Sequence, residues 1–240
     1  MGGKTFNRYE EKFLLREDQK NQLLKYLPKY CTMDPYCADR SVYHVYNLYY
    51  DTPDGQLIRE SVERPRYKEK LRFRSYRLPV GWEDPVYVEI KKKVDGRINK
   101  RRVRLPYGQA REWVENGKNP EFADYEGRQV SAEIEYFLQT HPLKPRYFIS
   151  YERIAMSAKD GSGIRVTFDS QIKERTADPD FVHDGGKDLL GPGYCLMEIK
   201  TSQNFPLWLT AQLSEMGLYA RSFSKVGSAH QIEIRGEQWI

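Results

Sequence analysis

The stretch Tyr67-Lys68-Glu69-Lys70-Leu71-Arg72-Phe73-Arg74 alternates basic residues with mostly apolar ones. Side chains two residues apart in a β-strand point to the same face of a sheet. The four basic side chains would therefore share one face of a strand, and the aromatic and leucine side chains would share the other face with Glu69. This stretch predicts a strand with one strongly basic face.

The same two-residue alternation recurs along the chain. It is found at residues 8–13, 88–93, 100–105, 164–169 and 197–200, and a further strand is expected over Arg146–Ile154, with Tyr151 and Arg153 on one face. One such strand would belong to an ordinary half-exposed sheet. Seven such strands allow a different arrangement, in which the sheet closes on itself with its charged faces inward around a polar channel.

Residues at helical spacing predict the layer that would cover the apolar outside of such a sheet. The expected helices are Asp18–Leu27, Pro53–Val62, Ala110–Glu115, Arg128–Gln139 and Pro206–Met216. Loops are expected at Lys118–Glu126 and Thr176–Pro192. Because no repeat or linker divides the chain, residues 1–240 are predicted to form a single domain.

The net charge of +5 conceals a strong asymmetry. Residues 64–104 contain 15 Lys or Arg and 5 Asp or Glu, a charge of +10, so the remaining chain carries −5. A solvated basic face would explain a charge run alone, but alternation with apolar residues favours an interior surface. Cations confined there repel one another and need counter-ions. A phosphate chain, or a nucleoside triphosphate with a divalent metal, would supply them.

Several other classes of protein are disfavoured. The longest stretch without a charge, Thr201–Ser214, has 14 residues, and a membrane-spanning helix needs about 20. No apolar leader is recognised, so a soluble, cytoplasmic protein is expected. The three cysteines and four histidines show no CxxC or HExxH spacing, which argues against a disulfide framework and a zinc site. No GxxxxGK[ST] or GxGxxG motif indicates a P-loop or dinucleotide-binding enzyme.

A series of short motifs follows the chain from end to end. It comprises Arg8-x-Glu10-x-Lys12, Tyr49-Tyr50-Asp51-Thr52-Pro53, Lys70-Leu71-Arg72-Phe73-Arg74, Val88-Glu89-Ile90-Lys91-Lys92-Lys93, Lys100-Arg101-Arg102, Tyr151-Glu152-Arg153, Arg165-Val166-Thr167-Phe168-Asp169, Met197-Glu198-Ile199-Lys200 and Ser222-Phe223-Ser224-Lys225. In this order the motifs resemble the VTC (polyphosphate polymerase) branch of the triphosphate tunnel metalloenzymes, the CYTH-like superfamily. Arg8 stands where that superfamily has an acid, which disfavours two-metal hydrolysis and favours binding of a long anion.

The resemblance implies an α+β fold, mainly an antiparallel closed β-barrel (the triphosphate tunnel fold) with covering helices. It implies a polyphosphate polymerase, an enzyme that moves the γ-phosphate of ATP onto a polyphosphate chain with Mn²⁺ or Mg²⁺. ATP and polyphosphate or pyrophosphate would be its ligands, and a membrane-protein partner is compatible with the family. No nucleic-acid partner is expected, because the basic residues alternate with apolar ones and no nucleic-acid-binding signature is present.

The resemblance also assigns roles to individual residues. Catalytic contacts to phosphates are expected from Lys12, Arg72, Arg74, Lys91, Lys100, Arg153, Arg165 and Lys225. Further substrate contacts are expected from Arg8, Lys70, Tyr151, Lys200 and Ser224. The metal would be held by Glu198, with Glu10 and Glu89 as further candidates.

Alternatives remain open at this point. The three glutamates could simply pair with cations across strands, and Asp169 could be a metal ligand or an ion-pair partner. Tyr43, Tyr46, Tyr49 and Tyr50 are expected to pack in the core or at its rim. The alternative functions are a non-catalytic polyphosphate-binding or sensing module and a triphosphate hydrolase or cyclase of the same superfamily.

Overall fold

The computed structural model describes residues 9–37, 42–63, 65–95 and 97–236. The chain divides into two compact units that are interleaved along the sequence. Over the described residues, unit 1 comprises Val45–Ile149 and Glu174–Gly186, and unit 2 comprises residues 9–44, Ser150–Lys173 and residues 187–236.

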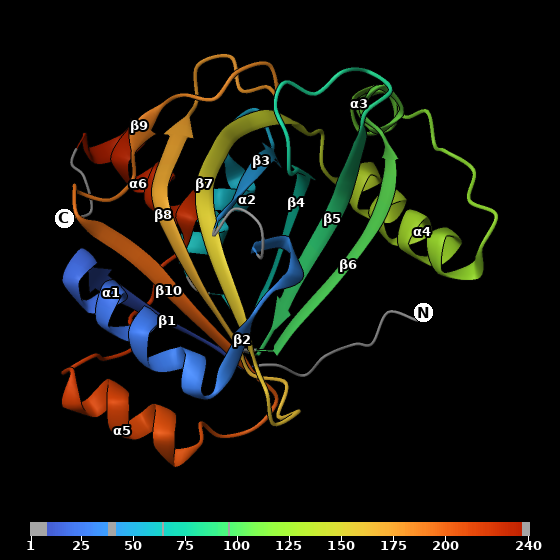
Figure 1. Ribbon diagram of the computed structural model, residues 1–240. Helices are drawn as coiled ribbons and strands as arrows, with labels where there is room; N and C mark the ends of the chain where they lie inside the picture. Colours follow the sequence, from blue (N-terminus) through green and yellow to red (C-terminus); the bar gives the residue numbers. More distant parts are fainter. Residues whose placement is uncertain (1–8, 38–41, 64, 96, 237–240) are drawn as a thin grey trace. The chain divides into compact units, whose positions relative to one another are not determined.

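Antiparallel strands form the centre of each unit (Figure 1). Unit 1 has the strand order β7-β3-β4-β5-β6, formed by β3 (Tyr43–Asp51), β4 (Tyr67–Ser75), β5 (Pro85–Val94), β6 (Arg97–Pro106) and the first part of β7 (Lys144–Ala158). Unit 2 has the order β1-β10-β8-β7, formed by β1 (Tyr9–Arg16), β10 (Tyr194–Thr201), β8 (Arg165–Arg175) and the rest of β7. The short strands β2 (Cys31–Met33) and β9 (Lys187–Asp188) pair with β7 and β8.

The expected α+β class with an antiparallel sheet and covering helices is confirmed. The expected closure of the barrel is corrected in one respect. Over the described residues, β1 and β6 stand at the two ends of the strand order, and hydrogen bonds do not join them. Closing a strongly twisted sheet requires the edge strands to meet in register, and no such ladder forms here. The polar channel expected from the sequence stays a prediction.

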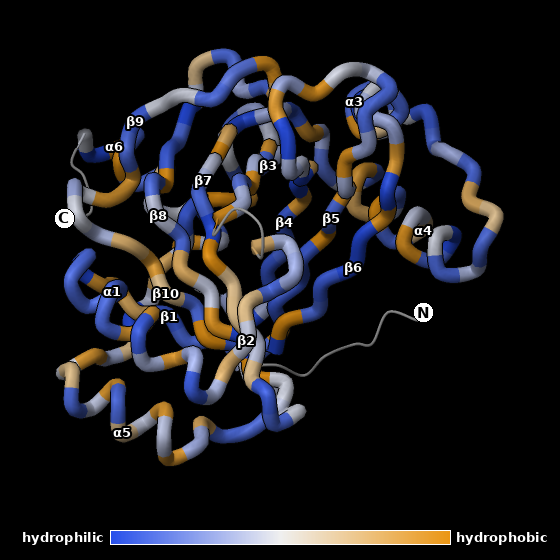
Figure 2. The backbone as a smooth tube through the Cα atoms, in the orientation of Figure 1, coloured by the Kyte–Doolittle hydropathy of each residue, from blue (hydrophilic) through white to orange (hydrophobic). Residues whose placement is uncertain are grey.

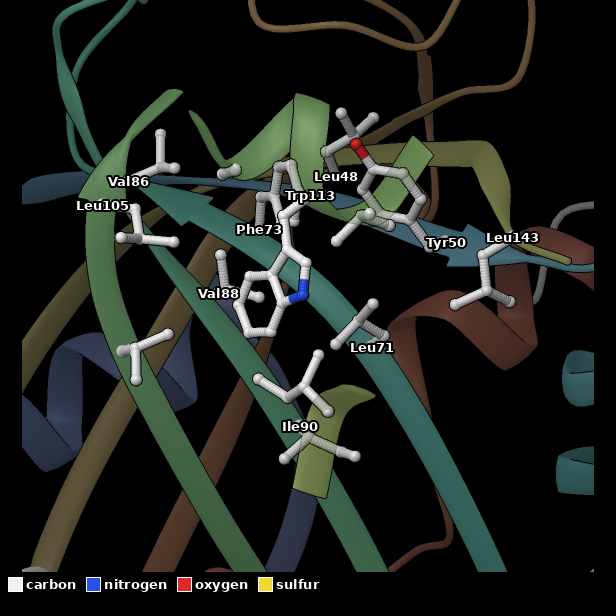
Figure 3. Close-up of a cluster of buried hydrophobic side chains, with 14 of the residues drawn as sticks. Leu48, Tyr50, Leu71, Phe73, Val86, Val88, Ile90, Leu105, Trp113 and Leu143 are labelled. Carbon is white, nitrogen blue, oxygen red and sulfur yellow. The ribbon is translucent and has the colours of Figure 1, made fainter. Parts of the chain in front are cut away.

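The apolar face of unit 1 packs against two helices, α3 (Tyr107–Asn116) and α4 (Tyr125–Thr140). Alternate residues of the strands supply this face, as the colours along β5 and β6 in Figure 2 indicate. Its core contains Leu71, Phe73, Val86, Val88, Ile90, Leu105 and Trp113 (Figure 3), together with Val103, Ile134 and Phe137. The buried indole of Trp113 donates a hydrogen bond to Glu135 on α4 (3.0 Å), which ties the two helices together. Helix α2 (Gln56–Val62) packs beside β4.

Unit 2 has its own core, built on the same pattern. Helix α1 (Glu17–Tyr26) and helix α5 (Leu207–Glu215) cover its sheet, and the short 3₁₀ turns Leu27–Lys29 and Pro35–Cys37 follow α1. The buried residues include Phe13, Leu15, Leu23, Val166, Phe168, Met197, Ile199, Leu209 and Leu213. Because each strand has its apolar residues on this face, its charged residues lie on the other face.

All seven predicted strands are present, and each of the five predicted helices is found with shifted ends. The short strands β2 and β9 and the two 3₁₀ turns were not predicted, and neither were two longer elements. Strand β3 is buried from Val45 to Asp51, on both faces, so it shows no alternation. Helix α6 (Lys225–Arg235) contains Gly227 and Ser228, which weaken its helical pattern. Among the helices of the described residues, none is both long and apolar enough to cross a membrane.

Candidate functional site

The charged face of unit 1 is defined by three strands in register. It consists of Lys68, Lys70, Arg72 and Arg74 on β4, Tyr87, Glu89, Lys91 and Lys93 on β5, and Lys100, Arg102 and Arg104 on β6. We call this surface the basic face. Among its described residues are nine Lys or Arg and a single acid, Glu89. The basic face therefore holds far more positive charge than its own carboxylate can offset.

Glu89 lies at the centre of the basic face, and its side chain is only 1% exposed. Its carboxylate contacts Lys100 Nζ at 2.6 Å and Arg72 Nη2 at 2.8 Å. Arg74 Nε and Arg102 Nη1 lie farther away, each at 3.8 Å. Burial opposes ionisation of Glu89, but the charges of these cations outweigh it and hold its pKa well below the usual value.

The same cluster affects Lys100 in the opposite way. Burial lowers the pKa of Lys100 well below its usual value, and Arg74 and Arg72 add to that effect against the attraction of Glu89. One carboxylate is thus not enough to stabilise the charge of every base around it. The cluster is short of anions.

Three lysines form a row across the basic face. Lys70 of β4 is the Cα partner of Lys91 on β5, and Lys91 is the partner of Lys100 on β6. Like charges directly opposite each other on a sheet are destabilising. The structure thus brings three predicted phosphate contacts together in a geometry that a bound anion would stabilise.

Two residues of β3 hold Arg72 and Arg74 of the basic face in place. Arg72 Nη1 donates to Tyr49 Oη at 2.7 Å, and Arg74 Nε donates to Asn47 Oδ1 at 3.0 Å. Asn47 in turn donates to the carbonyl of Ile149 (3.0 Å), which fixes its orientation. Tyr49 was expected only to pack, and Asn47 was not singled out. Both stand opposite their arginines in the β3–β4 register, which the buried strand β3 did not reveal in the sequence.

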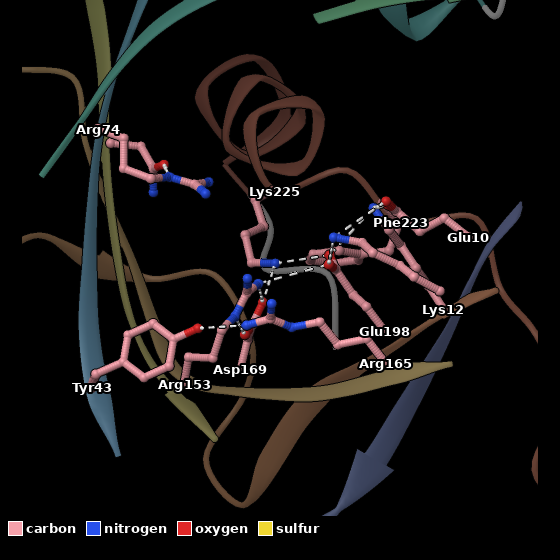
Figure 4. A network of polar contacts seen from close by, with 12 residues as sticks. Glu10, Lys12, Tyr43, Arg74, Arg153, Arg165, Asp169, Glu198, Phe223 and Lys225 are labelled. Atoms are coloured by element: carbon pink, nitrogen blue, oxygen red, sulfur yellow. Dashed lines mark hydrogen bonds and ion pairs between the residues drawn. The ribbon is translucent and has the colours of Figure 1, made fainter. Parts of the chain in front are cut away.

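The charged face of unit 2 centres on Glu198 of β10 (Figure 4). Its Oε1 lies 3.2 Å from Lys225 Nζ and 3.5 Å from Lys12 Nζ. Its Oε2 lies 3.7 Å from Arg153 Nη2 and 3.7 Å from Lys200 Nζ. Burial opposes ionisation, but Lys225, Lys12 and the other two cations outweigh it and hold the pKa of Glu198 well below its usual value. Four predicted site residues therefore surround the predicted metal ligand.

Asp169 lies beside this cluster as a fully buried carboxylate. Arg153 donates to both of its oxygens, at 2.6 and 2.7 Å, and Lys225 Nζ lies 2.5 Å away. These cations outweigh the effect of burial and lower the pKa of Asp169. Of the two roles left open by the sequence, this geometry supports the ion-pair partner.

The entry into helix α6 positions Lys225. Ser224 is the N-cap residue of the helix, and its Oγ accepts a hydrogen bond from the Gly227 N–H at 3.2 Å. Lys12 Nζ donates to the carbonyl of Phe223 at 2.8 Å. The ring of Tyr151 lies under Lys225 Nζ, 4.6 Å from the ring centroid. The predicted substrate contacts Ser224 and Tyr151 thus lie beside Lys225, where both also have structural roles.

Arg165 differs from the other predicted bases of unit 2. It contacts Asp34 at 2.7 Å and donates to Tyr43 Oη at 3.5 Å, and its side chain is 38% exposed. Asp34 was not predicted as part of the site, because it lies far from any strand motif. Arg165 nevertheless stands opposite Lys200 in the β8–β10 register.

Thr167 was also missed as a candidate. It lies between Arg165 and Asp169 on the charged face and stands opposite Glu198 in register. Its hydroxyl is buried and has no hydrogen-bond partner within the described part of the chain. Because a buried hydroxyl without a partner costs free energy, Thr167 becomes a further candidate for a ligand contact.

The donor set of unit 2 fits a hard divalent cation that arrives with phosphate oxygens. Glu10 contacts Lys12 at 3.2 Å and Lys200 at 3.7 Å, the same two lysines that contact Glu198. The two carboxylates therefore lie on one face as diagonal neighbours across β1 and β10. Over the described residues, no group of three or more His, Cys, Asp or Glu is placed to hold a metal ion. Glu89 is surrounded by four cations, and this geometry favours a role as their counter-ion over a role as a metal ligand. The predicted site residue Arg8 lies outside the described residues.

The fold and the site together define a class of protein, an antiparallel sheet with covering helices whose charged faces, built from alternate strand residues, gather many cations around a few carboxylates. The model of the VTC domain family matches residues 7–232. The chain belongs to the VTC domain family.

Two solved structures share the fold at low sequence identity. One is a candidate adenylate cyclase from Bacillus halodurans, with a TM-score of 0.56 and 13% identity, covering 96% of this chain and 100% of that one. The other is a candidate adenylyl cyclase from Hippeastrum, described as revealing a dominant triphosphatase activity, with a TM-score of 0.54 and 15% identity, covering 96% of each chain. No curated protein matches the sequence.

Proposed function

We propose that the protein is a polyphosphate polymerase-type phosphotransferase that moves the γ-phosphate of ATP onto a polyphosphate chain. The observation that carries this proposal is the basic face, with nine Lys or Arg against one carboxylate. A single small anion would leave most of these charges without a counter-ion, whereas a chain of phosphates would neutralise several rows at once. Membership of the VTC domain family supports the same function.

The proposed reaction needs little covalent chemistry from the protein. A terminal oxygen of the acceptor chain attacks the γ-phosphorus, the bond from that phosphorus to the β–γ bridging oxygen breaks, and ADP leaves with the oxygen. Catalysis of such a transfer rests on positioning and charge neutralisation. The protein would orient the phosphates through the arginine forks and lysine ammonium groups described above.

Each charged face carries residues that would act on phosphates. In unit 1, Lys70, Lys91, Lys100, Arg72 and Arg74 would bind phosphates of the nucleotide and of the chain. In unit 2, Lys12, Lys200, Arg153 and Lys225 would bind phosphates that carry a metal ion, with Arg165, Tyr151 and Ser224 beside them. Glu198 and Glu10 would hold Mn²⁺ or Mg²⁺, which when bound supplies further neutralisation of phosphate oxygens.

An assay of product formation tests the proposal. The purified protein is incubated with ATP and Mn²⁺ or Mg²⁺, with and without a pyrophosphate primer, and the products are separated on a gel. We expect a ladder of polyphosphate and one ADP for each phosphate added to a chain. The absence of polymer under all of these conditions would refute the polymerase activity.

A pair of neighbouring variants sharpens the assay. Lys91→Ala removes the central lysine of the basic face and is expected to lower turnover at least about 100-fold, as loss of a preorganised charge at a reacting group does. Lys92 lies on the opposite face, where it contacts Glu69 and Glu133, each at 2.9 Å. Lys92→Ala is the matched control and should retain most of the activity. Equal losses in both variants would argue against a role of the basic face.

Triphosphate hydrolysis is the second candidate function. It is favoured by the Hippeastrum structure, which has the same fold and is described as a triphosphatase. Release of orthophosphate from tripolyphosphate, without polymer from ATP, would select it. Tight binding of polyphosphate with neither product would select the non-catalytic binding module.

A further inference from the structure

An aromatic residue interrupts the basic face at one end. Tyr87 lies on β5 two residues before Glu89 and stands opposite Arg74 on β4 and Arg104 on β6. The guanidinium carbon of Arg102 lies over its ring, 4.4 Å from the centroid. The ring of Tyr76 meets that of Tyr87 edge to face, with 6.1 Å between the centroids and an interplanar angle of 76°. Three flat groups thus gather at this end.

These groups are open to solvent where the centre of the basic face is not. The side chain of Arg102 is 48% exposed and Tyr76 is 44% exposed, whereas Glu89 is 1% exposed. A guanidinium group that stacks on an aromatic ring presents its second planar side outward. The end of the face is therefore a partly exposed stacking surface beside Arg72 and Arg74, whose side chains are only 16% and 9% exposed.

We propose that Arg102, Tyr87 and Tyr76 form a platform on which the base of the substrate nucleotide stacks while its phosphates lie among the cations of the basic face. This proposal rests on the proposed function only in placing phosphates on that face. Arg102 connects the two parts, because its Nη1 also lies 3.8 Å from Glu89. Stacking on Arg and aromatic side chains tolerates every base, since each base has a flat π-face.

The platform predicts a selectivity with two features. A nucleoside triphosphate should bind more tightly than tripolyphosphate, which carries a similar charge but has no base. Adenine and guanine should bind with similar affinity, because a stacking platform reads the face of a base and not its edge. Loss of one stacking contact is expected to reduce the preference for the nucleotide about tenfold.

Calorimetric titration of the full chain tests this without any turnover. The probes are the β,γ-imido analogues of ATP and GTP and inorganic tripolyphosphate, all with Mg²⁺. The measured quantity is the ratio of the tripolyphosphate Kd to the nucleotide Kd. We expect a ratio well above one for the wild type, a fall of about tenfold in Tyr87→Leu, a smaller fall in Tyr76→Ala, and retention of the ratio in Tyr87→Phe, which keeps the ring.

The outcomes separate this proposal from the proposed function. A ratio near one in the wild type, or an unchanged ratio in both Tyr87→Leu and Tyr76→Ala, would overturn the platform while leaving phosphate binding intact. Failure of both the nucleotide analogues and tripolyphosphate to bind would overturn the platform and the proposed function together. Tyr76→Ala changes an exposed side chain, so it keeps the test valid if Tyr87→Leu folds poorly. Thermal unfolding of each variant checks the fold.

Discussion

The two charged faces are built in the same way but differ in their balance of charge. Both consist of alternate residues on antiparallel strands whose other residues pack in an apolar core. The basic face of unit 1 has nine bases and one acid. The face of unit 2 brings together five bases, Lys12, Arg153, Arg165, Lys200 and Lys225, with the three acids Glu10, Asp169 and Glu198. The basic face of unit 1 therefore has an excess of positive charge that a polyanion would offset, whereas the acids on the charged face of unit 2 offset most of its positive charge.

The two central glutamates show what this difference means for chemistry. Glu89 is held by close contacts of 2.6 and 2.8 Å to Lys100 and Arg72. Glu198 is shared among four cations at 3.2 to 3.7 Å. A carboxylate with longer contacts can exchange a cation for a metal ion at lower cost, because less Coulomb energy is lost. The comparison supports the proposal that the basic face of unit 1 binds phosphates and that the charged face of unit 2 holds the metal.

The largest expected effect is that of Glu198→Gln on turnover. The change removes the charge of the proposed metal ligand while keeping the shape of the side chain, so we expect the rate to fall about 1,000-fold, as it does when a key electrostatic group is lost. Binding of tripolyphosphate should not weaken, since the site becomes more positive. Steady-state rates and calorimetry measure the two quantities.

Glu152→Gln is the matched control for this variant. Glu152 lies on β7 next to Arg153 in sequence and hence on the opposite face of the strand. Its replacement should leave the rate within about twofold, as for surface positions away from a site. An undiminished rate in Glu198→Gln would remove the distinction between the two faces.

Glu89→Gln should instead affect stability most. It leaves the partly exposed Arg72 and Lys100 without their buried carboxylate, and breaking a buried ion pair in this way costs about 3–5 kcal/mol. Tripolyphosphate should restore much of the loss, because it supplies the missing negative charge. Urea unfolding with and without tripolyphosphate measures both effects.

Glu69→Gln provides the comparison on the opposite face of the sheet, where Glu69 contacts Lys92 at 2.9 Å. Its loss should be smaller, and tripolyphosphate should not correct it. If Glu89→Gln were as stable as the wild type without any ligand, the basic face would not be short of anions.

The stability of the wild type and of Glu89→Gln should also depend differently on pH below neutrality, which is a third, smaller effect. The pKa of Glu89 is lower in the folded chain than its ordinary value of about 4.3. Its charge therefore stabilises the fold fully above that ordinary value, and this contribution is lost as the pH falls through the folded pKa. The stability gap between the wild type and Glu89→Gln should be constant from pH 7 to about 5 and should shrink below about pH 4. Urea midpoints of both proteins across this range measure the gap, and a gap that stays constant to pH 3 would contradict the prediction.

The alternation of basic and apolar residues was sufficient to predict the strands that carry the charged faces. It could not predict β3, because a strand buried on both sides has no alternation. The contacts of Asn47 and Tyr49 with the arginines were missed for the same reason. The roles of the three glutamates depend on register and distance, so the sequence left metal binding and ion pairing open. The pairing of Arg165 with Asp34 joins distant segments and has no local signal at all.

Thr167→Val should have the smallest effect, and the sign of the change in the free energy of unfolding is informative. The Thr167 hydroxyl is buried on the charged face of unit 2 without a hydrogen-bond partner in the described part of the chain. Valine keeps the shape and removes the unsatisfied group, so the free energy of unfolding should stay the same or rise by up to about 1 kcal/mol. If the hydroxyl serves the ligand, the Kd for tripolyphosphate should rise about threefold to tenfold, the loss expected for one hydrogen bond.

Thr201→Val is the matched control for a threonine with an internal role. The Thr201 hydroxyl donates to the carbonyl of Gln203 at 2.9 Å and accepts from its N–H at 3.1 Å. Its replacement should lower stability by about 1 kcal/mol and leave the tripolyphosphate Kd unchanged. The two variants thus predict opposite patterns in the same pair of measurements, urea unfolding and calorimetry. If Thr167→Val lost stability and kept its affinity, its hydroxyl would belong to the fold, and the charged face of unit 2 would bind ligand through its ions alone.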